Sequence, residues 1–302
     1  MKVQLIHNPV SGSHHASRLD LLKQAFAACG ATVTVGETRL DSQRTISNDC
    51  DLLCVSGGDG TLGLVIAEIA RNALNIPICV FPAGTVNLVA RELGYSADPE
   101  LFAREVMTGF VAGSESRLRD PVVQTEHAPV VACLSAGPDG VAVATHSPSW
   151  KKRIGKSAYA LSFLKLFTRW PRNRFMLKAT DKQGASVTFP GEAFYIAKGR
   201  YFAGPWTLSP SAFLGQEHFH LIALTNAGRF SFFRFMLRVA MGRDPSRLPF
   251  VQSMAARAVQ VETNGSLQSV LAFQIDGDPM PEAPAEISVT EQYIEYCLPR
   301  PG

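Results

Sequence analysis

The segment Ser-Gly-Gly-Asp-Gly-Thr at 56–61 has the residue types of a phosphate-binding loop. It directly follows the apolar run 52–55 and directly precedes a helical pattern. Glycines allow backbone N–H groups to turn toward an anion, and a helix N-terminus adds the positive end of its dipole. The segment matches neither a Walker A loop nor the Gly-x-Gly-x-x-Gly of dinucleotide sites. We therefore predict an anion site with these binding residues: Gly57, Gly58, Gly60 and Thr61.

Asp59 is the unusual member of this loop. A carboxylate beside a phosphate is repelled unless a divalent cation or a reacting hydroxyl lies between them. Asp59 is therefore a candidate for catalysis and for metal binding. The alternative is a tight turn in which Asp59 only caps a helix.

Two further segments leave predicted strands in the same direction. Pro-Ala-Gly-Thr-Val-Asn at 82–87 follows the strand 78–81, and Asn-Pro-Val-Ser-Gly-Ser at 8–13 follows the strand 2–6. Ligands of open parallel sheets bind at the carboxyl edge of the strands. Each segment alone could be an ordinary turn, but three on one edge favour a nucleotide cleft. The additional binding candidates are Asn8, Ser11, Gly12, Gly84, Thr85 and Asn87.

The first third of the chain predicts the sheet that would position these loops. Short apolar runs alternate with helical patterns, and strands separated by helices pair in parallel through right-handed crossovers. The predicted strands are 2–6, 32–35, 52–55 and 78–81. The predicted helices are 16–28, 61–71, 86–93 and one that begins after Asp98 and is closed by Gly109.

Beyond about residue 115, short strand-like segments follow one another between Gly, Pro and Asn turns, which is typical of an antiparallel sandwich. The predicted strands are 130–134, 186–189, 193–197, 219–224, 258–262, 271–275 and 287–289, with helical inserts at 156–170 and 230–241. The 302 residues suit two domains of ordinary size. We predict an α/β domain with an open parallel sheet over 1–120 and a β-rich sandwich domain over 121–302.

Charge differs between these two predicted domains. Residues 1–120 carry 10 Lys and Arg against 13 Asp and Glu, whereas 121–302 carry 19 against 13. No acid lies between Asp139 and Asp181, a stretch with nine basic residues. Such a block serves nucleic acid, phosphates or an anionic membrane, or it is a solvated face.

Segment 227–247 combines aromatic and basic residues at helical spacing. They are Phe230, Phe232, Phe233 and Phe235 with Arg229, Arg234, Arg238, Arg243 and Arg247. This pattern suits an interfacial helix that enters lipid headgroups. In the alternative, the phenylalanines pack into the sandwich and the arginines extend to solvent.

The chain shows no apolar run of the ~18 residues that a membrane span needs. Its apolar start meets His7, Asn8 and Pro9 too early for a signal peptide. We therefore expect an intracellular protein whose six cysteines are reduced.

The segments at 8–12, 57–61 and 82–87 resemble the signature of the diacylglycerol kinase catalytic-domain family, specifically its soluble bacterial lipid kinases, which are related to sphingosine and ceramide kinases. The similarity extends over the whole chain. Further segments that resemble family motifs lie at 135–140, 152–159, 199–212 and 275–278. The Gly-Gly-Asp-Gly loop is shared with NAD kinases, but the later segments are specific to the lipid kinases.

The resemblance implies ATP as phosphate donor, Mg²⁺ near Asp59, and a lipid hydroxyl as acceptor. Asp276 would take the hydroxyl proton, and its neighbour Asp278 would help to bind the cofactor. Without the family context, Asp276-Gly277 reads as a hairpin turn. The expected protein is a cytoplasmic, membrane-peripheral kinase whose partners are its lipid substrate and an anionic membrane surface. No nucleic-acid partner is expected, and homodimerisation stays open.

Three departures from the family pattern keep alternatives open. Leu88 stands where the family has Asp, the segment 214–217 replaces an acidic motif, and Lys198 stands where the family has Asn. These positions permit a catalytically weakened nucleotide- or lipid-binding protein. An NAD kinase is a further alternative, which the basic, Phe-rich second domain disfavours.

Overall fold

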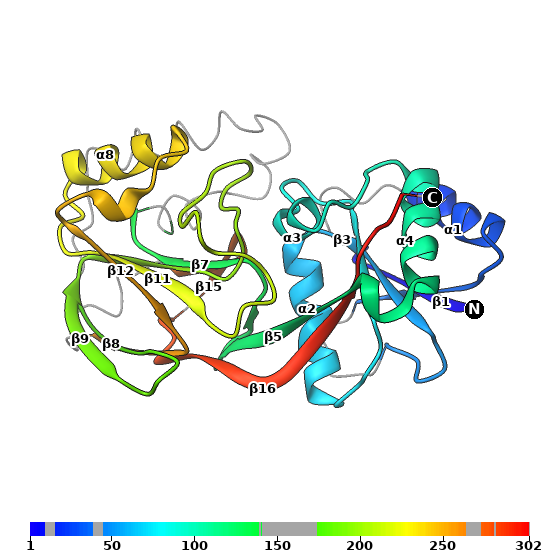
Figure 1. The fold of residues 1–302 in the computed structure, drawn as a ribbon, viewed down its shortest axis with the longest axis horizontal. Coiled ribbons are helices and arrows are strands. Elements are labelled where there is room, and N and C mark those ends of the chain that lie inside the picture. Colours follow the sequence, from blue (N-terminus) through cyan, green and yellow to red (C-terminus); the bar gives the residue numbers. More distant parts are fainter. Residues whose placement is uncertain are drawn as a thin grey trace. The chain divides into compact units, whose positions relative to one another are not determined.

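The computed structural model describes residues 1–9, 16–38, 45–138, 140, 174–263, 273–280 and 282–301. The chain forms two compact units (Figure 1). The first comprises Met1–Val122 together with Thr290–Gly302, and the second comprises Val123–Val289. Residues 290–302, assigned to the second domain from the sequence, thus belong to the first unit.

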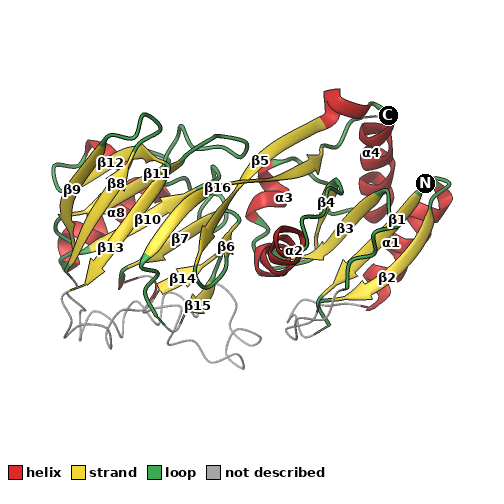
Figure 2. Cartoon of the chain, turned by 90° about the horizontal axis from the view of Figure 1, so that it is seen from below, coloured by secondary structure: helices red, strands yellow, loops and turns green. Residues whose placement is uncertain are grey.

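The first unit contains the predicted open parallel sheet, which confirms the α/β fold. Its strands run in the order β2 (Thr32–Glu37), β1 (Lys2–His7), β3 (Leu52–Gly57) and β4 (Ile78–Pro82). Its helices are α1 (Ala16–Ala28), α2 (Asp59–Arg71), α3 (Leu88–Glu92) and α4 (Pro99–Val111). All six residues of β3 are buried, as expected for a strand that helices cover on both faces. Figure 2 shows these strands and helices from below.

Helix α4 begins as the sequence predicts but ends later. The Asp98 carboxylate accepts the Leu101 N–H at 2.8 Å, and Pro99 occupies the first helical position. The predicted end at Gly109 is wrong, because the helix continues to Val111. A Cβ at Gly109 would overlap the carbonyl oxygen of Leu298, so the glycine allows the C-terminal segment to approach the helix.

Two strands carry the chain out of the first unit and back. β5 (Arg117–Thr125) leaves it, and β16 (Glu286–Cys297) returns to it. The sequence predicts only 287–289 of this last strand. At its far end Tyr296 pairs with Ile78 of β4.

The second unit is an antiparallel sandwich, as predicted. One sheet has the order β12-β11-β10-β7-β14-β15, and the other contains β16, β13, β8 and β9. The strands are β6 (Pro129–Val130), β7 (Cys133–Ala136), β8 (Phe175–Thr180), β9 (Ser186–Gly191), β10 (Ala193–Ala197), β11 (Phe219–Leu224), β12 (Val251–Ala256), β13 (Ala258–Thr263), β14 (Phe273–Ile275) and β15 (Asp278–Met280).

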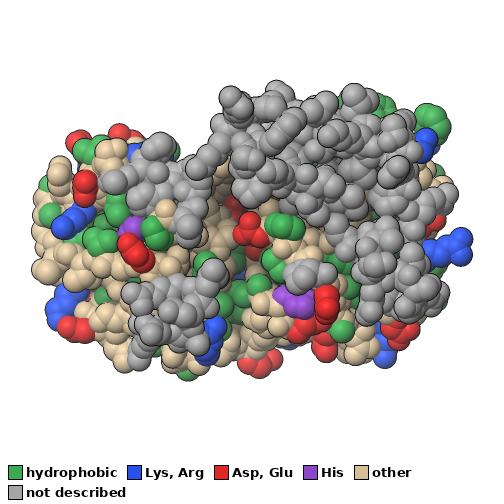
Figure 3. Space-filling view, turned by 180° about the vertical axis from the view of Figure 1, so that it is seen from behind, with side chains coloured by type: hydrophobic (Ala, Val, Ile, Leu, Met, Phe, Trp, Pro, Cys, Tyr) green, Lys and Arg blue, Asp and Glu red, His purple; other side chains and the backbone are tan. Residues whose placement is uncertain are grey.

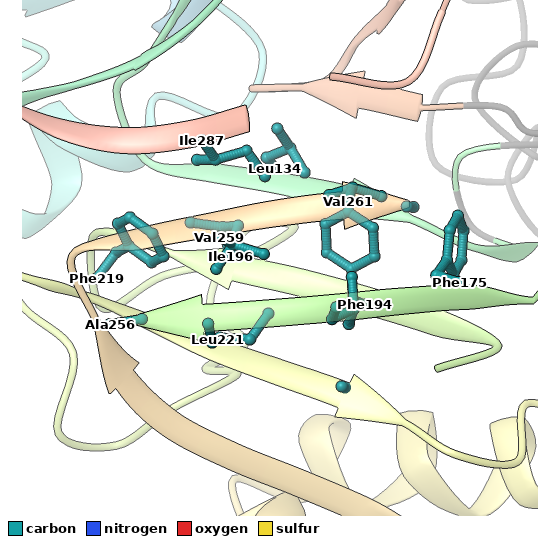
Figure 4. Packing of buried hydrophobic residues seen from close by; sticks show 14 of the residues in the cluster. Leu134, Phe175, Phe194, Ile196, Phe219, Leu221, Ala256, Val259, Val261 and Ile287 are labelled. Carbon is teal, nitrogen blue, oxygen red and sulfur yellow. The ribbon is translucent and has the colours of Figure 1, made fainter. Parts of the chain in front are cut away.

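Alternate side chains of both sheets fill the space between them (Figure 4). The ring of Phe175 lies edge-on to that of Phe194, with centroids 5.3 Å apart, and Phe273 packs against both at 6.1 Å. Helix α8 (Arg229–Ala240) confirms the second predicted insert. The first insert, at 156–170, lies outside the described residues.

Candidate active site

The glycine loops after β3 and β4 lie side by side in the first unit. Gly57 pairs with Pro82 in the parallel ladder, and the Ala83 N–H donates to the Gly57 carbonyl at 3.2 Å. A Cβ at Gly84 would lie 2.5 Å from the Cα of Gly58. The two backbones touch where each loop leaves its strand, so neither position has room for a larger residue without movement.

Asp59 connects these two loops. Its side chain is buried, and its carboxylate accepts the N–H of Leu88 at 2.9 Å and of Val89 at 3.1 Å. These are the first N–H groups of α3. The first N–H groups of an α-helix have no acceptor within the helix itself, so they need one from outside it. Asp59 is therefore a helix cap, but of α3 rather than of α2, the helix that it begins. Leu88 takes part through its backbone, where a side-chain carboxylate is expected from the family pattern.

Asn87 gives the second loop its shape. It adopts the left-handed conformation at φ 55°, which Asn tolerates better than most residues. Its side-chain amide accepts the Gly84 N–H and donates to the Gly84 carbonyl, both at 2.8 Å. This ring closes the loop on itself and leaves Thr85 exposed at its tip.

The other binding candidates of the first unit take positions at the same edge. Asn8 follows His7, which pairs with Ser56 of β3. Gly60 and Thr61 lie in the first turn of α2, and the buried Thr61 side chain packs where a Cβ on Gly57 would be. Ser11 and Gly12 lie outside the described residues. The structure thus brings together Asn8, Gly57, Gly58, Asp59, Gly60, Thr61, Gly84, Thr85 and Asn87.

Asp276 lies in the second unit, at the turn between β14 and β15. Asp276 and Gly277 both have positive φ, 52° and 87°, as in the tight hairpin that the sequence offered as an alternative. The Asp276 carboxylate nevertheless turns back into the unit. It accepts the N–H groups of Val131, Ala132 and Cys133, each at 2.9 Å.

These bonds explain why the single strand predicted over 130–134 is two strands. The N–H groups of residues 131–133 donate to the Asp276 side chain, so β6 ends at Val130 and β7 begins at Cys133. Asp278, the first residue of β15, is exposed beside the turn. Lys198 is buried in the same region, and its backbone N–H donates to the Ala132 carbonyl at 2.9 Å.

Among the described residues, no group of three or more His, Cys, Asp or Glu side chains could hold a metal ion. Both oxygens of Asp59 face backbone N–H groups. The metal role of Asp59 stays a prediction. A divalent cation at this edge would depend mainly on oxygens that a bound phosphate and water supply.

The chain thus combines a parallel α/β unit, which has glycine loops at the carboxyl edge of its sheet, with an antiparallel sandwich unit. Residues 2–113 match the family model of the diacylglycerol kinase catalytic domain, and residues 132–297 match that of the YegS C-terminal NAD kinase beta sandwich-like domain. The chain therefore belongs to the diacylglycerol kinase family, as the resemblance implies.

Individual relatives agree with this assignment. A diacylglycerol kinase of Staphylococcus saprophyticus is 26% identical over 310 residues, covering 99% of this chain and 95% of that protein. One from Staphylococcus epidermidis is 27% identical over 311 residues, covering 99% and 92%. The crystal structure of a diacylglycerol kinase from Bacillus anthracis shares the fold, with a TM-score of 0.72 at 19% identity over 98% of this chain and 96% of that one.

No helix within the described residues combines the length and apolar character that crossing a bilayer requires.

Proposed function

We propose that this protein is a lipid kinase that transfers the γ-phosphate of ATP to a hydroxyl of a membrane lipid such as diacylglycerol. The observation that carries the proposal is the pair of glycine loops that Asp59 joins at the carboxyl edge of the sheet. The family assignment and the diacylglycerol kinases among its relatives support it.

The first unit would bind the nucleotide. The phosphates would lie against the N–H groups of the 57–61 loop and the N-terminus of α2, where the helix dipole favours negative charge. Asn8, Ser11, Gly12 and the 84–87 loop would complete the site. ATP would arrive as its Mg²⁺ complex, in which phosphate oxygens and waters hold most of the metal and the cation neutralises developing charge.

Asp276 would orient the acceptor hydroxyl and take its proton. Three backbone N–H groups fix the direction of this carboxylate, and phosphoryl transfer depends on positioning more than on covalent chemistry. Asp278, on the next strand, would contribute to the charge of the site. Positioned acid–base groups contribute about 10²–10⁴-fold in rate.

The test is phosphorylation of diacylglycerol in detergent micelles by ATP labelled at the γ-phosphate, with and without Mg²⁺. The expected result is label in the organic phase that requires the cation. Asp276→Asn should lower the rate about 10²–10⁴-fold. Asp181→Asn is the matched control, because Asp181 accepts two backbone N–H bonds in a hairpin of the same unit and has no proposed role in catalysis.

Other outcomes distinguish the alternatives. Label in a different lipid would redirect the substrate, and label in NAD would indicate an NAD kinase. ATP binding without transfer to any acceptor would favour the weakened binding protein that Leu88 and the segment 214–217 suggest. Unchanged turnover in Asp276→Asn would make Asp276 a structural turn residue only.

A further inference from the structure

Helix α8 is apolar on two opposite faces. Phe232, Phe235 and Val239 are buried against the six-stranded sheet, where the Phe235 ring stacks on that of Tyr195 with centroids 5.2 Å apart. Figure 1 shows the helix as a separate layer over these strands. This inner face accounts for the folding of the helix and for only part of its apolar residues.

The outer face carries a second apolar stripe. Phe230 is 80% exposed, Phe233 60%, Leu237 47% and Met241 53%. Their spacing of three, four and four residues places them along one line of the helix. Scattered apolar side chains are ordinary on a protein surface, but a contiguous stripe of large ones marks an interaction site. We call these four residues the outer stripe.

The charged residues of α8 itself are all basic. Arg229, Arg234 and Arg238 lie on the helix, Arg243 follows it, and residues 218–243 contain no Asp or Glu. A carboxylate lies near each end of the helix, and each accepts a backbone N–H group: Glu192 that of Ala227 and Asp244 that of Ser246, both at 2.9 Å. On the face that Figure 3 shows, the described acidic and basic side chains are interspersed. A stripe of this kind therefore fits an apolar partner with an anionic surface.

We propose that the outer stripe of α8 docks on an anionic lipid bilayer. The apolar side chains would enter the boundary between headgroups and acyl chains, and the arginines would contact lipid phosphates. The inference deepens the proposed function, on which it rests for its biological purpose, by naming the surface that brings the enzyme to its substrate. Docking itself requires neither ATP nor catalysis.

The test is sedimentation of the full chain with vesicles in the absence of ATP. One set contains phosphatidylcholine alone, and the other contains phosphatidylcholine with phosphatidylglycerol. The wild-type chain should bind the anionic set more strongly. The double variant Phe230→Ala with Phe233→Ala should lower the partition coefficient about tenfold, which corresponds to about 1.4 kcal/mol. Met176→Ala is the control, because Met176 is 44% exposed on β8, outside this helix.

The arginines are tested separately. Arg234→Gln with Arg243→Gln should weaken binding to anionic vesicles and should flatten its dependence on salt, because the electrostatic part of the attraction is lost. Circular dichroism checks that each variant is folded.

Three results would overturn the proposal: no vesicle binding by the wild-type chain, equal binding by the Phe230/Phe233 double variant, or an equal loss with Met176→Ala. Sedimentation velocity shows what the second of these results would mean. If the double variant abolishes self-association and leaves vesicle binding intact, the outer stripe is a contact between copies of this chain. Vesicle binding without lipid phosphorylation would leave this inference standing and remove the proposed function.

Discussion

The Asp59 and Asp276 carboxylates accept backbone N–H groups of segments far away in the sequence. Asp59 binds the N–H of Leu88, 29 residues away, and Asp276 binds that of Val131, 145 residues away. Each side chain therefore shapes the loop around it as well as offering a charge. For Asp59, the segment that depends on it is the second glycine loop.

Asp59→Ala should have two effects: weaker nucleotide binding and a lower free energy of unfolding of the first unit. Removing the acceptor leaves the N–H groups of Leu88 and Val89 without this partner, at a cost of about 1–3 kcal/mol. Titration of a fluorescent ATP analogue and urea unfolding measure the two effects. Asp98→Ala is the control, because Asp98 caps α4 through one similar bond. Unchanged ATP binding in Asp59→Ala would contradict this role.

The contact between the two loops predicts a graded pair of variants. Gly84→Ala should lower the free energy of unfolding by about 1–3 kcal/mol, because its Cβ meets the Gly58 backbone at 2.5 Å. Gly58→Ala should cost less, since its Cβ would lie 3.3 Å from the Gly84 Cα. Urea unfolding of both variants gives the order, and the reverse order would show that the loops do not touch in this way.

Burial lowers the pKa of His220, and the nearby charge of His218 lowers it further. Burial also lowers the pKa of His218, with a smaller contribution from the charge of Lys182. The unfolded chain then binds protons at a higher pH than the folded chain does. The free energy of unfolding should therefore fall as pH drops below about 6.5, the ordinary histidine value. Unfolding at pH 7.5 and at pH 5.5 measures the decline, and His220→Gln should reduce it. An equal decline in this variant would assign it to other groups.

At the scale of elements, local patterns predict well wherever a strand and its loop are neighbours in sequence. The glycines directly after β3 and β4 indicate that the chain turns there. The position of the two loops at the carboxyl edge of the sheet can therefore be predicted from the sequence. The Asp276 bonds to residues 131–133 do not, because no local signal reports a partner so distant. Helix α8 shows a different limit: both of its faces are apolar, so periodicity alone does not tell which phenylalanines are buried.

Gly109 gives a prediction for α4. Gly109→Ala should lower the free energy of unfolding by about 1–3 kcal/mol, because the new Cβ would displace the Leu298 carbonyl from the helix. In an isolated helix the same change would stabilise, since alanine favours helix more than glycine does. Arg104→Ala, at an exposed position of α4, is the control for thermal unfolding. A stabilised Gly109→Ala would show that the C-terminal segment is not held against the helix.

At the scale of the molecule, the second unit is an insertion between residues 122 and 290 of the first. The sequence predicts the architecture of each unit but not the return of the chain to the first unit. The predicted end of the strand β16 is residue 289, whereas its pairing with β4 is made by Tyr296. The returning segment is well bound: the Tyr95 hydroxyl donates to the Cys297 carbonyl at 2.6 Å, and the Arg300 N–H donates to the Glu105 carbonyl at 3.0 Å.

Deleting residues 290–302 should therefore damage the first unit. It removes the acceptor of the buried Tyr95 hydroxyl and the strand that pairs with Ile78. Limited proteolysis with mass spectrometry should show rapid cleavage within residues 1–122 and slower cleavage within 123–289. Deleting only residues 301–302 is the control. Preferential cleavage of the second unit instead would mean that the returning segment stabilises that unit.

The order of the chain also sets an order of events on the ribosome. The second unit has all of its residues as soon as residue 289 has emerged, whereas the first waits for its last strand. At about 5–20 residues per second, this wait lasts on the order of ten seconds or more. Throughout it, the edge of β4 lacks its partner and can pair with other nascent chains unless a chaperone covers it. The unit that is translated first is the one that completes its folding last.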